Sequence, residues 1–160
     1  MNADQGFTFT ATGEGKGYDL VGDRCTIKIG GAQTGGAYML IDDWVPPGVG
    51  TPPHSHRRED EAFYILEGEM TFGVDERTVT ARPGALVHLP RGSLHWFKND
   101  SSRPARMLLL TCPAGFENFV AEVGIPVTNA AIPPAPPTEA HIGRVLALAA
   151  KYGIDIKLPA

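Results

Sequence analysis

The chain has 160 residues, of which 42% are hydrophobic and 20% are charged, and its formal net charge is −4 at pH 7. This composition is that of an ordinary globular domain, and the excess of acidic residues argues against nucleic-acid binding, which needs a basic patch. The sequence has neither a run of about 18 apolar residues nor a signal-peptide pattern in MNADQGFTFT. We therefore expect one domain over residues 1–160, located in the cytoplasm, with neither nucleic acid nor a membrane as partner.

Glycine and proline, with 19 and 14 residues, divide the first two thirds of the chain into short segments, which predicts short strands. Residues 25–29 alternate at period two and predict a strand. Residues 38–45 predict a second, more buried strand, which ends at Pro46. A glycine-rich phosphate-binding loop is the functional alternative for residues 13–17, but this stretch lacks the Lys-Ser/Thr pair and the helix of a P-loop.

The middle of the chain predicts further strands. Residues 61–72 are expected to form a strand that bends at Gly68, and residues 74–78 are expected to form the turn of a hairpin. Arg82-Pro83-Gly84 suits a type II turn, with proline at i+1 and glycine at i+2. Further strands are expected at residues 85–89, 95–97 and 106–111.

After Pro113 the pattern becomes helical. An apolar face at i, i+3, i+4 and i+7 predicts a helix over residues 116–123, ended by Gly124. The proline-rich residues 129–137 predict an extended spacer, and binding of an SH3-like partner is the alternative. Thr138 is a suitable N-cap for a second helix that ends at Gly153. The apolar face expected for this second helix is Ile142, Val145, Leu146, Ala149 and Tyr152.

These elements predict an all-β body with two short C-terminal helices. The barrel is expected over about residues 20–112 and the helical extension over residues 113–160. Cys25 and Cys112 form no C-x-x-C motif, and we expect two buried thiols in a reducing compartment. A disulfide and a metal-bound thiolate are the alternatives.

The spacing of three histidines and a glutamate predicts a metal centre. His54 and His56 are two residues apart, so on a strand both point to the same side. Glu61 follows five residues after His56, which breaks this parity, so a turn must lie in the polar stretch 57–60. His95 comes from a later strand. Glu59 and Asp60 are rival ligands, but parity with the strand that follows favours Glu61.

Three imidazoles and a carboxylate occupy four positions of an octahedron and leave two neighbouring positions for water, dioxygen or substrate. This donor set suits one divalent ion per chain, Fe, Mn, Ni, Cu or Zn, and does not choose among them. His88 lies outside the pattern, and we expect a packed histidine there, with a role beside the pocket as the alternative.

At these positions the chain resembles the cupin superfamily. The first motif, Gly-x5-His-x-His-x4-Glu-x6-Gly, is matched by Gly48, His54, His56, Glu61 and Gly68. The second, Gly-x5-Pro-x-Gly-x2-His-x3-Asn, is matched by Gly84, Pro90, Gly92, His95 and Asn99. The resemblance implies a double-stranded β-helix, or jelly-roll barrel, lined by His54, His56, Glu61 and His95 as ligands. Ala85 departs from the common Gly-Asp opening of the second motif, at a turn and not at a ligand.

Residues 58–68 and 111–119 are also similar to small bacterial cupins that are described as quercetinase-like. This resemblance implies a metal-dependent dioxygenase acting on a small aromatic or enolisable, flavonol-like molecule. Glu61 is the expected catalytic residue, since a carboxylate in an apolar cavity has a raised pKa and accepts a substrate proton. Small cupins are often homodimers, so a second copy is the expected protein partner.

Four apolar side chains are expected to wall the substrate pocket, and core packing is the alternative role for each. They are Phe63, Ile65, Phe72 and Phe97. A non-redox isomerase, cyclase or lyase, or a small-molecule-binding protein without turnover, is the alternative function.

Overall fold

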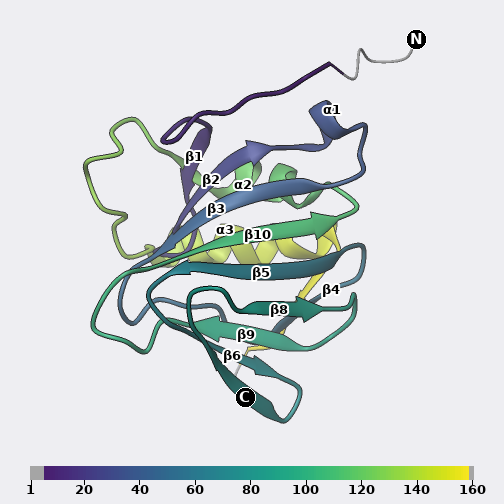
Figure 1. The fold of residues 1–160 in the computed structure, drawn as a ribbon. Coiled ribbons are helices and arrows are strands. Elements are labelled where there is room, and N and C mark those ends of the chain that lie inside the picture. Colours follow the sequence, from purple (N-terminus) through teal and green to yellow (C-terminus); the bar gives the residue numbers. More distant parts are fainter. Residues whose placement is uncertain (1–5, 159–160) are drawn as a thin grey trace.

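Two antiparallel sheets form the body of the protein in the computed structural model, which describes residues 6–158 (Figure 1). The larger sheet has the order β11 (Ile125–Pro126), β1 (Lys16–Asp19), β2 (Arg24–Ile29), β3 (Met39–Val45), β10 (Ala105–Cys112), β5 (Asp60–Glu67) and β8 (Leu86–Leu89). The smaller sheet has the order β12 (Ile154–Ile156), β4 (His54–His56), β9 (His95–Lys98), β6 (Met70–Val74) and β7 (Arg77–Ala81). The helices are α1 (Gly31–Thr34), α2 (Phe116–Val123) and α3 (Glu139–Ala149), and α3 continues into the 3-10 turn η1 (Ala150–Tyr152).

The all-β double-stranded β-helix with two C-terminal helices is thereby confirmed. Residues 1–5 and 159–160 lie outside the described part of the chain, and so do the first residues of the stretch examined for a signal peptide. Among residues 6–158, no helix combines the length and the apolar character that crossing a membrane would need.

Strict alternation along the central strands creates the core. On β3, β5 and β10, every second side chain is buried between the layers. The rings of Phe63, Phe72 and Phe97 meet at the centre, with centroids 5.2 Å to 6.2 Å apart. Each such buried side chain contributes about 1.5–3 kcal/mol, so this cluster holds the two sheets together.

The prediction of a single strand over residues 61–72 is wrong. The chain leaves the larger sheet at Glu67 and enters the smaller sheet at Met70. Gly68 makes this crossing with a φ of +73°, and a Cβ there would lie 2.7 Å from the carbonyl oxygen of Pro104. Because L-residues rarely adopt this conformation, glycine marks a change of sheet here and not a bend within one strand.

The predicted turns are confirmed. β6 and β7 pair around the expected hairpin, with Val74 opposite Arg77. At the type II turn, the Ala85 backbone N–H donates to the carbonyl of Arg82 at 2.9 Å, and Gly84 has a φ of +91°.

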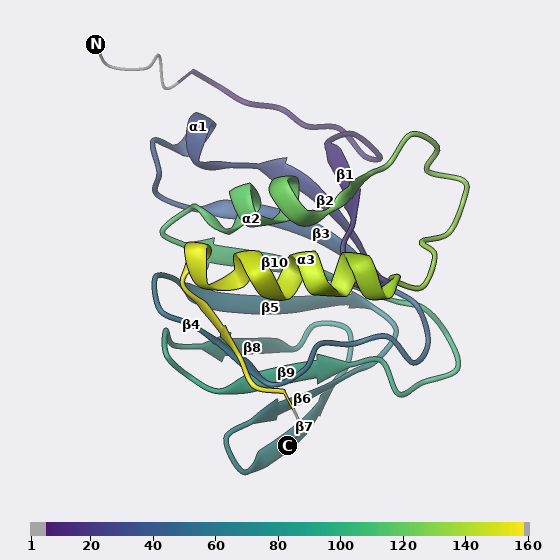
Figure 2. The same cartoon turned by 180° about the vertical axis from the view of Figure 1, so that it is seen from behind.

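The two C-terminal helices cover the upper part of the larger sheet, on the side where the smaller sheet covers the lower part (Figure 2). The predicted apolar face of α2 is buried, and Gly124 ends that helix in extended and not left-handed backbone. Thr138 caps α3 by accepting a hydrogen bond from the backbone N–H of His141 at 3.2 Å. Val145 and Ala149 anchor α3, whereas the side chain of Ile142 remains 41% exposed.

The C-terminal extension is not purely helical, which corrects the boundary expected for the barrel. β12 pairs with β4, placing Ile154 opposite His56 and Ile156 opposite His54. At the other end, β1 and β11 extend the larger sheet beyond β2, and residues 31–34 form a helical turn. These elements have two to four residues each, too few for a periodic pattern to show.

We expect truncation after Pro137 to destabilise the protein strongly. The truncated chain loses α3 and β12, and with them the buried Val145 and Ile154. At about 1.5–3 kcal/mol for each large buried side chain, the loss is about 3–6 kcal/mol. Urea denaturation of the truncated protein measures it, and removal of residues 157–160 alone is the control. An unchanged unfolding midpoint would show that α3 is not docked.

Two acidic residues and a thiol lie buried together at β2 and β3 of the larger sheet. Cys25 Sγ is 3.7 Å from Asp23 Oδ2 and 3.9 Å from Asp43 Oδ1. Burial raises the pKa of Asp43 well above its usual range, and the neighbouring carboxylates of Asp23 and Asp42 raise it further. Cys25 is thus a buried free thiol as expected. The prediction of a buried thiol is wrong for Cys112, because this residue occupies an outward position at the end of β10 and is exposed.

The raised pKa of Asp43 gives an expected pH dependence of stability. The folded state holds the Asp43 proton more tightly than the unfolded chain, so the contribution of Asp43 to the free energy of unfolding is greatest at low pH. It falls as pH rises from the unfolded pKa, about 4, towards the raised folded value. Asp43→Asn cannot ionise and should show a smaller fall over that range in urea denaturation. Asp75→Asn, at the exposed β6–β7 turn, is the control, and equal pH slopes in wild type and Asp43→Asn would contradict the prediction.

Candidate metal centre

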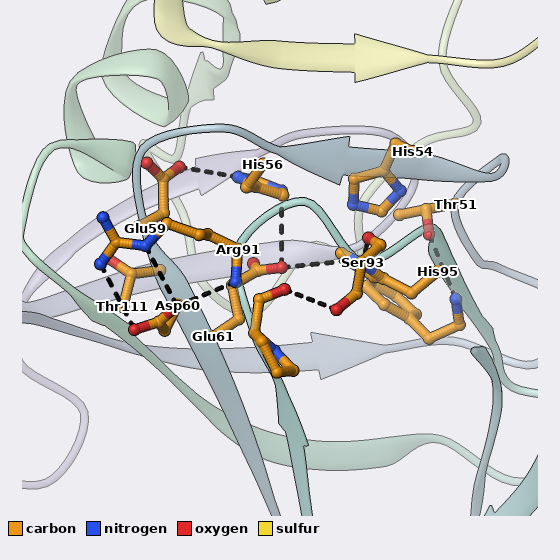
Figure 3. Close-up of polar contacts among 12 residues, drawn as sticks. Thr51, His54, His56, Glu59, Asp60, Glu61, Arg91, Ser93, His95 and Thr111 are labelled. Carbon is orange, nitrogen blue, oxygen red and sulfur yellow. Dashed lines mark hydrogen bonds and ion pairs between the residues drawn. The ribbon is translucent and has the colours of Figure 1, made fainter. Parts of the chain in front are cut away.

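Four side chains from three strands converge inside one end of the barrel (Figure 3). His54 and His56 come from β4, His95 from the adjacent β9, and Glu61 from β5 in the facing sheet. One ligand atom from each lies within 4.8 Å of all the others. The structure therefore brings together the four residues that the spacing singled out.

Two donor atoms of this cluster, Glu61 Oε2 and His95 Nε2, lack hydrogen-bond partners among the described residues. Glu61 Oε2 lies 3.0 Å from His95 Nε2 and 3.6 Å from His56 Nε2. Within the described residues, neither Glu61 Oε2 nor His95 Nε2 finds a hydrogen bond of acceptable geometry, although both residues are at least 97% buried. Buried polar atoms without partners are costly. Their convergence on a common point fits a bound cation, and the set of imidazole and carboxylate donors suits a transition metal.

The hydrogen bond made by Nδ1, the outer nitrogen of each ring, fixes which nitrogen of the histidine faces the centre. Nδ1 of His54 lies 2.9 Å from the carbonyl of Pro52, and Nδ1 of His95 lies 3.0 Å from the carbonyl of Ser93. A carbonyl oxygen only accepts hydrogen bonds, so these nitrogens carry the proton and their Nε2 lone pairs point inward. Such outer hydrogen bonds orient metal-binding imidazoles.

His56 differs from the other two because its partner is a carboxylate. Its Nδ1 lies 2.7 Å from Oε1 of Glu59, which is itself buried. Glu59, expected only as a rival ligand, thus holds a ligand in place. Asp60 turns outward and pairs with Arg91. Neither belongs to the four-donor set.

The electrostatics of the cluster favour a neutral His54 and an ionised Glu61, whereas the carboxylates of Glu61 and Glu59 outweigh burial and raise the pKa of His56. Burial, together with the neighbouring His95 and His56, lowers the pKa of His54 to about 4, so its ring is neutral near pH 7. Burial alone would raise the pKa of Glu61, but the facing imidazoles of His56 and His95 outweigh it and lower that pKa. This corrects the raised pKa expected for Glu61, which is held as a carboxylate.

A cavity of about 330 Å³ adjoins His54 and His56. Its walls come from residues 50–56 before and on β4, from the loop around Leu20 and from the elements α2, α3 and β12. The side chains expected to wall the pocket lie instead in the packed core of the barrel, and none lines this cavity. These are Phe63, Ile65, Phe72 and Phe97. The sequence signal for this cavity was the apolar faces of the two C-terminal helices, which we interpreted only as surfaces that pack on the barrel.

His88 has neither of the roles considered for it. It faces outward on β8, opposite Ala62 of β5, and is exposed. On β8 the inward position next to it belongs to Leu89, which is buried. Parity along the strand therefore removes His88 from the centre.

Comparison with known proteins agrees with this geometry. The cupin domain family matches residues 44–111. Quercetin 2,3-dioxygenase of Bacillus subtilis is 31% identical over 119 residues, which is 73% of this chain and 35% of the relative. Germin-like protein subfamily 2 member 2 of Arabidopsis thaliana is 36% identical over 86 residues, 51% of this chain and 39% of the relative. The chain therefore spans well under half the length of these two curated relatives.

A solved structure shares the fold at low sequence identity. KdgF from Halomonas sp. superposes with a TM-score of 0.62 at 18% identity, covering 69% of this chain and 99% of the other. At this identity the likeness shows a common architecture, a barrel of the same kind around the same two-sheet core.

Proposed function

We propose that this chain, a member of the cupin superfamily, is a metal-dependent dioxygenase. Its expected substrate is a small aromatic or enolisable, flavonol-like molecule. The observation that carries this proposal is the set of four converging donors, two of them buried without hydrogen bonds. A divalent ion held by these four donors would supply further coordination positions for the reaction. The similarity to quercetin 2,3-dioxygenase supports the choice of reaction.

The residues around the centre each have a defined task in this proposal. His54, His56 and His95 would hold the ion through Nε2, while their Nδ1 atoms are held from outside. A divalent ion bound there supplies Lewis acidity and a template for the substrate oxygen. Glu61, kept as a carboxylate by its neighbours, would complete the donor set through Oε2, and its other carboxylate oxygen accepts the proton of a substrate hydroxyl. The apolar cavity next to His54 and His56 keeps bulk water away from the reacting groups.

The test is metal analysis combined with oxygen consumption. Protein expressed separately with Fe, Mn, Ni, Cu and Zn is analysed for its metal content, and oxygen uptake is then measured on a panel of flavonols. One redox-active ion per chain with flavonol-dependent oxygen uptake is the expected result. Zinc with oxygen-independent turnover of an enolisable substrate would contradict the dioxygenase and favour the isomerase, cyclase or lyase alternative.

The proposal includes a reducing compartment, the cytoplasm. Cys25 and Cys112 are both free thiols and lie at different depths, one buried and one exposed. Unpaired thiols are typical of cytoplasmic proteins.

We further expect a homodimer. The outer face of the larger sheet presents a row of apolar side chains, in which Leu86 pairs across to Tyr64 and Tyr64 to Leu108. Leu86 is 63% and Tyr64 43% exposed, and contiguous exposed apolar surface is typical of interfaces. Sedimentation at micromolar concentration should give twice the 17.1 kDa of one chain, and Tyr64→Glu should return the protein to a monomer. A monomeric wild type would contradict this expectation.

A further inference from the structure

We propose that the C-terminal segment made of α3 and β12 selects the ligand of the metal centre, and that this ligand is an uncharged, largely apolar molecule. The inference rests on the proposed function for the location of the site, and it adds the ligand class and the segment that recognises it. The segment lies beyond residues 44–111, the part that matches the cupin domain family. The walls that this segment adds to the cavity therefore lie outside the part of the barrel that matches the family.

The walls of the cavity are the first observation. α3 contributes Ile142, Val145 and Leu146, and β12 contributes Ile154 and Ile156. Phe116 and Phe119 of α2 also line it, and the ring of Phe116 stands edge-on to that of His56 with ring centroids 5.2 Å apart. These surfaces form a slot of aliphatic and aromatic side chains that leads to the metal ligands. Such walls suit a flat apolar ligand.

The near absence of polar groups is the second observation. Within residues 6–158, no lysine, arginine, aspartate or glutamate lines this cavity, and Thr51 is the only hydroxyl on its wall. That hydroxyl already accepts a hydrogen bond from the backbone N–H of Phe97 at 3.2 Å. Away from the centre, a charged group of a ligand would therefore meet one hydroxyl and no side chain of opposite charge among the described residues. Burying an unpaired charge is costly, so the cavity disfavours acids and phosphates.

The charge of the centre points the same way. Two buried carboxylates, Glu61 and Glu59, accompany the histidines. Together they balance the two positive charges of a divalent ion. An anionic ligand would add uncompensated negative charge in an apolar surrounding, whereas a neutral hydroxyl adds none.

Ile142 stands at the entrance of this slot. Its side chain lines the cavity and yet is 41% exposed, so it lies where the cavity meets solvent. α3 is held elsewhere, by the buried Val145 and Ala149 and by His141, whose Nε2 lies 2.9 Å from the carbonyl of Val123. Substitution of Ile142 should therefore change the entrance without unfolding the helix.

The experiment measures binding and turnover separately. Isothermal titration of metal-loaded protein without oxygen uses quercetin and 1-naphthol as neutral probes and oxalate and glucose 6-phosphate as charged ones. We expect wild type to bind the neutral probes more tightly than the charged ones. Ile142→Glu should weaken neutral binding by at least about tenfold, since it places a charge against the apolar ligand, with metal content and melting temperature unchanged. Ile132→Glu, on the exposed proline-rich segment away from the cavity, is the matched control and should bind as wild type does.

The results separate this inference from the proposed function. Equal neutral binding by Ile142→Glu and wild type would overturn the inference even if the protein consumes oxygen. Tighter binding of oxalate or glucose 6-phosphate by wild type, or no binding of either neutral probe, would also overturn it and needs no variant. In a third outcome, wild type binds the neutral probes but consumes no oxygen, and Ile142→Glu loses this binding. That outcome would uphold the inference and contradict the dioxygenase.

Discussion

Replacing His56 by alanine should lower the metal content from one divalent ion per chain to background and abolish turnover. His56 is the most firmly held of the three imidazoles, because a buried carboxylate holds its Nδ1 at 2.7 Å while its Nε2 faces Glu61. Its removal takes away one of four donors and breaks the same-strand pair with His54. Elemental analysis after expression with each of the five metals gives the content, and oxygen uptake gives the turnover.

The fold should survive this substitution. The four residues of the metal centre lie at one end of the barrel, and none of them belongs to the hydrophobic core cluster. We therefore expect folding not to depend on the ion, unlike the folding of a small zinc finger. Glu59 loses its partner, and a buried group left without a hydrogen bond costs about 1–3 kcal/mol. Circular dichroism should therefore keep its β-sheet character at a lower melting temperature. His88→Ala, on the exposed side of β8, is the control and should keep its metal. A wild type with no more metal than His56→Ala would end both the site and the enzyme proposal.

Replacing Glu59 by glutamine should weaken metal binding by about 10–100-fold, the range found when outer partners of metal ligands are changed. Glutamine keeps the size of the side chain and an oxygen that accepts from Nδ1 of His56. It removes the negative charge that strengthens this hydrogen bond and makes the imidazole a better donor. Competition between the protein and a metal chelator measures the affinity, and the absorption spectrum of bound Co²⁺ reports whether the ligand geometry is kept.

The neighbouring Asp60 provides the matched control for Glu59. Its carboxylate accepts a hydrogen bond from the Arg91 backbone at 2.8 Å and pairs with that side chain at the surface, away from the histidines. Asp60→Asn therefore removes the same charge one residue away without touching a ligand and should keep wild-type affinity. Equal affinities for Glu59→Gln and wild type would show that Glu59 only fills space. Equal losses in both variants would show a general effect of charge.

The four donors could be predicted from the sequence because their geometry is largely local. Residues two apart on a strand share a face, and the polar stretch 57–60 had to hold a turn for Glu61 to point inward. The hairpin turn predicted over residues 74–78 and the type II turn predicted at Gly84 also depend only on neighbouring residues. Both predictions were confirmed. The two C-terminal helices were predicted correctly for the same reason, since each carries its apolar period and its cap within one short segment.

The remaining features of the site depend on residues that are distant in the sequence, and only the tertiary structure decided them. The pKa of Glu61 is lowered and not raised, because three imidazoles from β4 and β9 surround it. Glu59 became an orienting partner once the turn before β5 folded it back onto His56. The cavity joins α2, α3 and β12 to β4, and a strand as short as β12 has no pattern by which to be found. Local spacing thus determined which residues form the centre, whereas burial and charge, which depend on distances across the fold, decided their protonation states and the walls beside them.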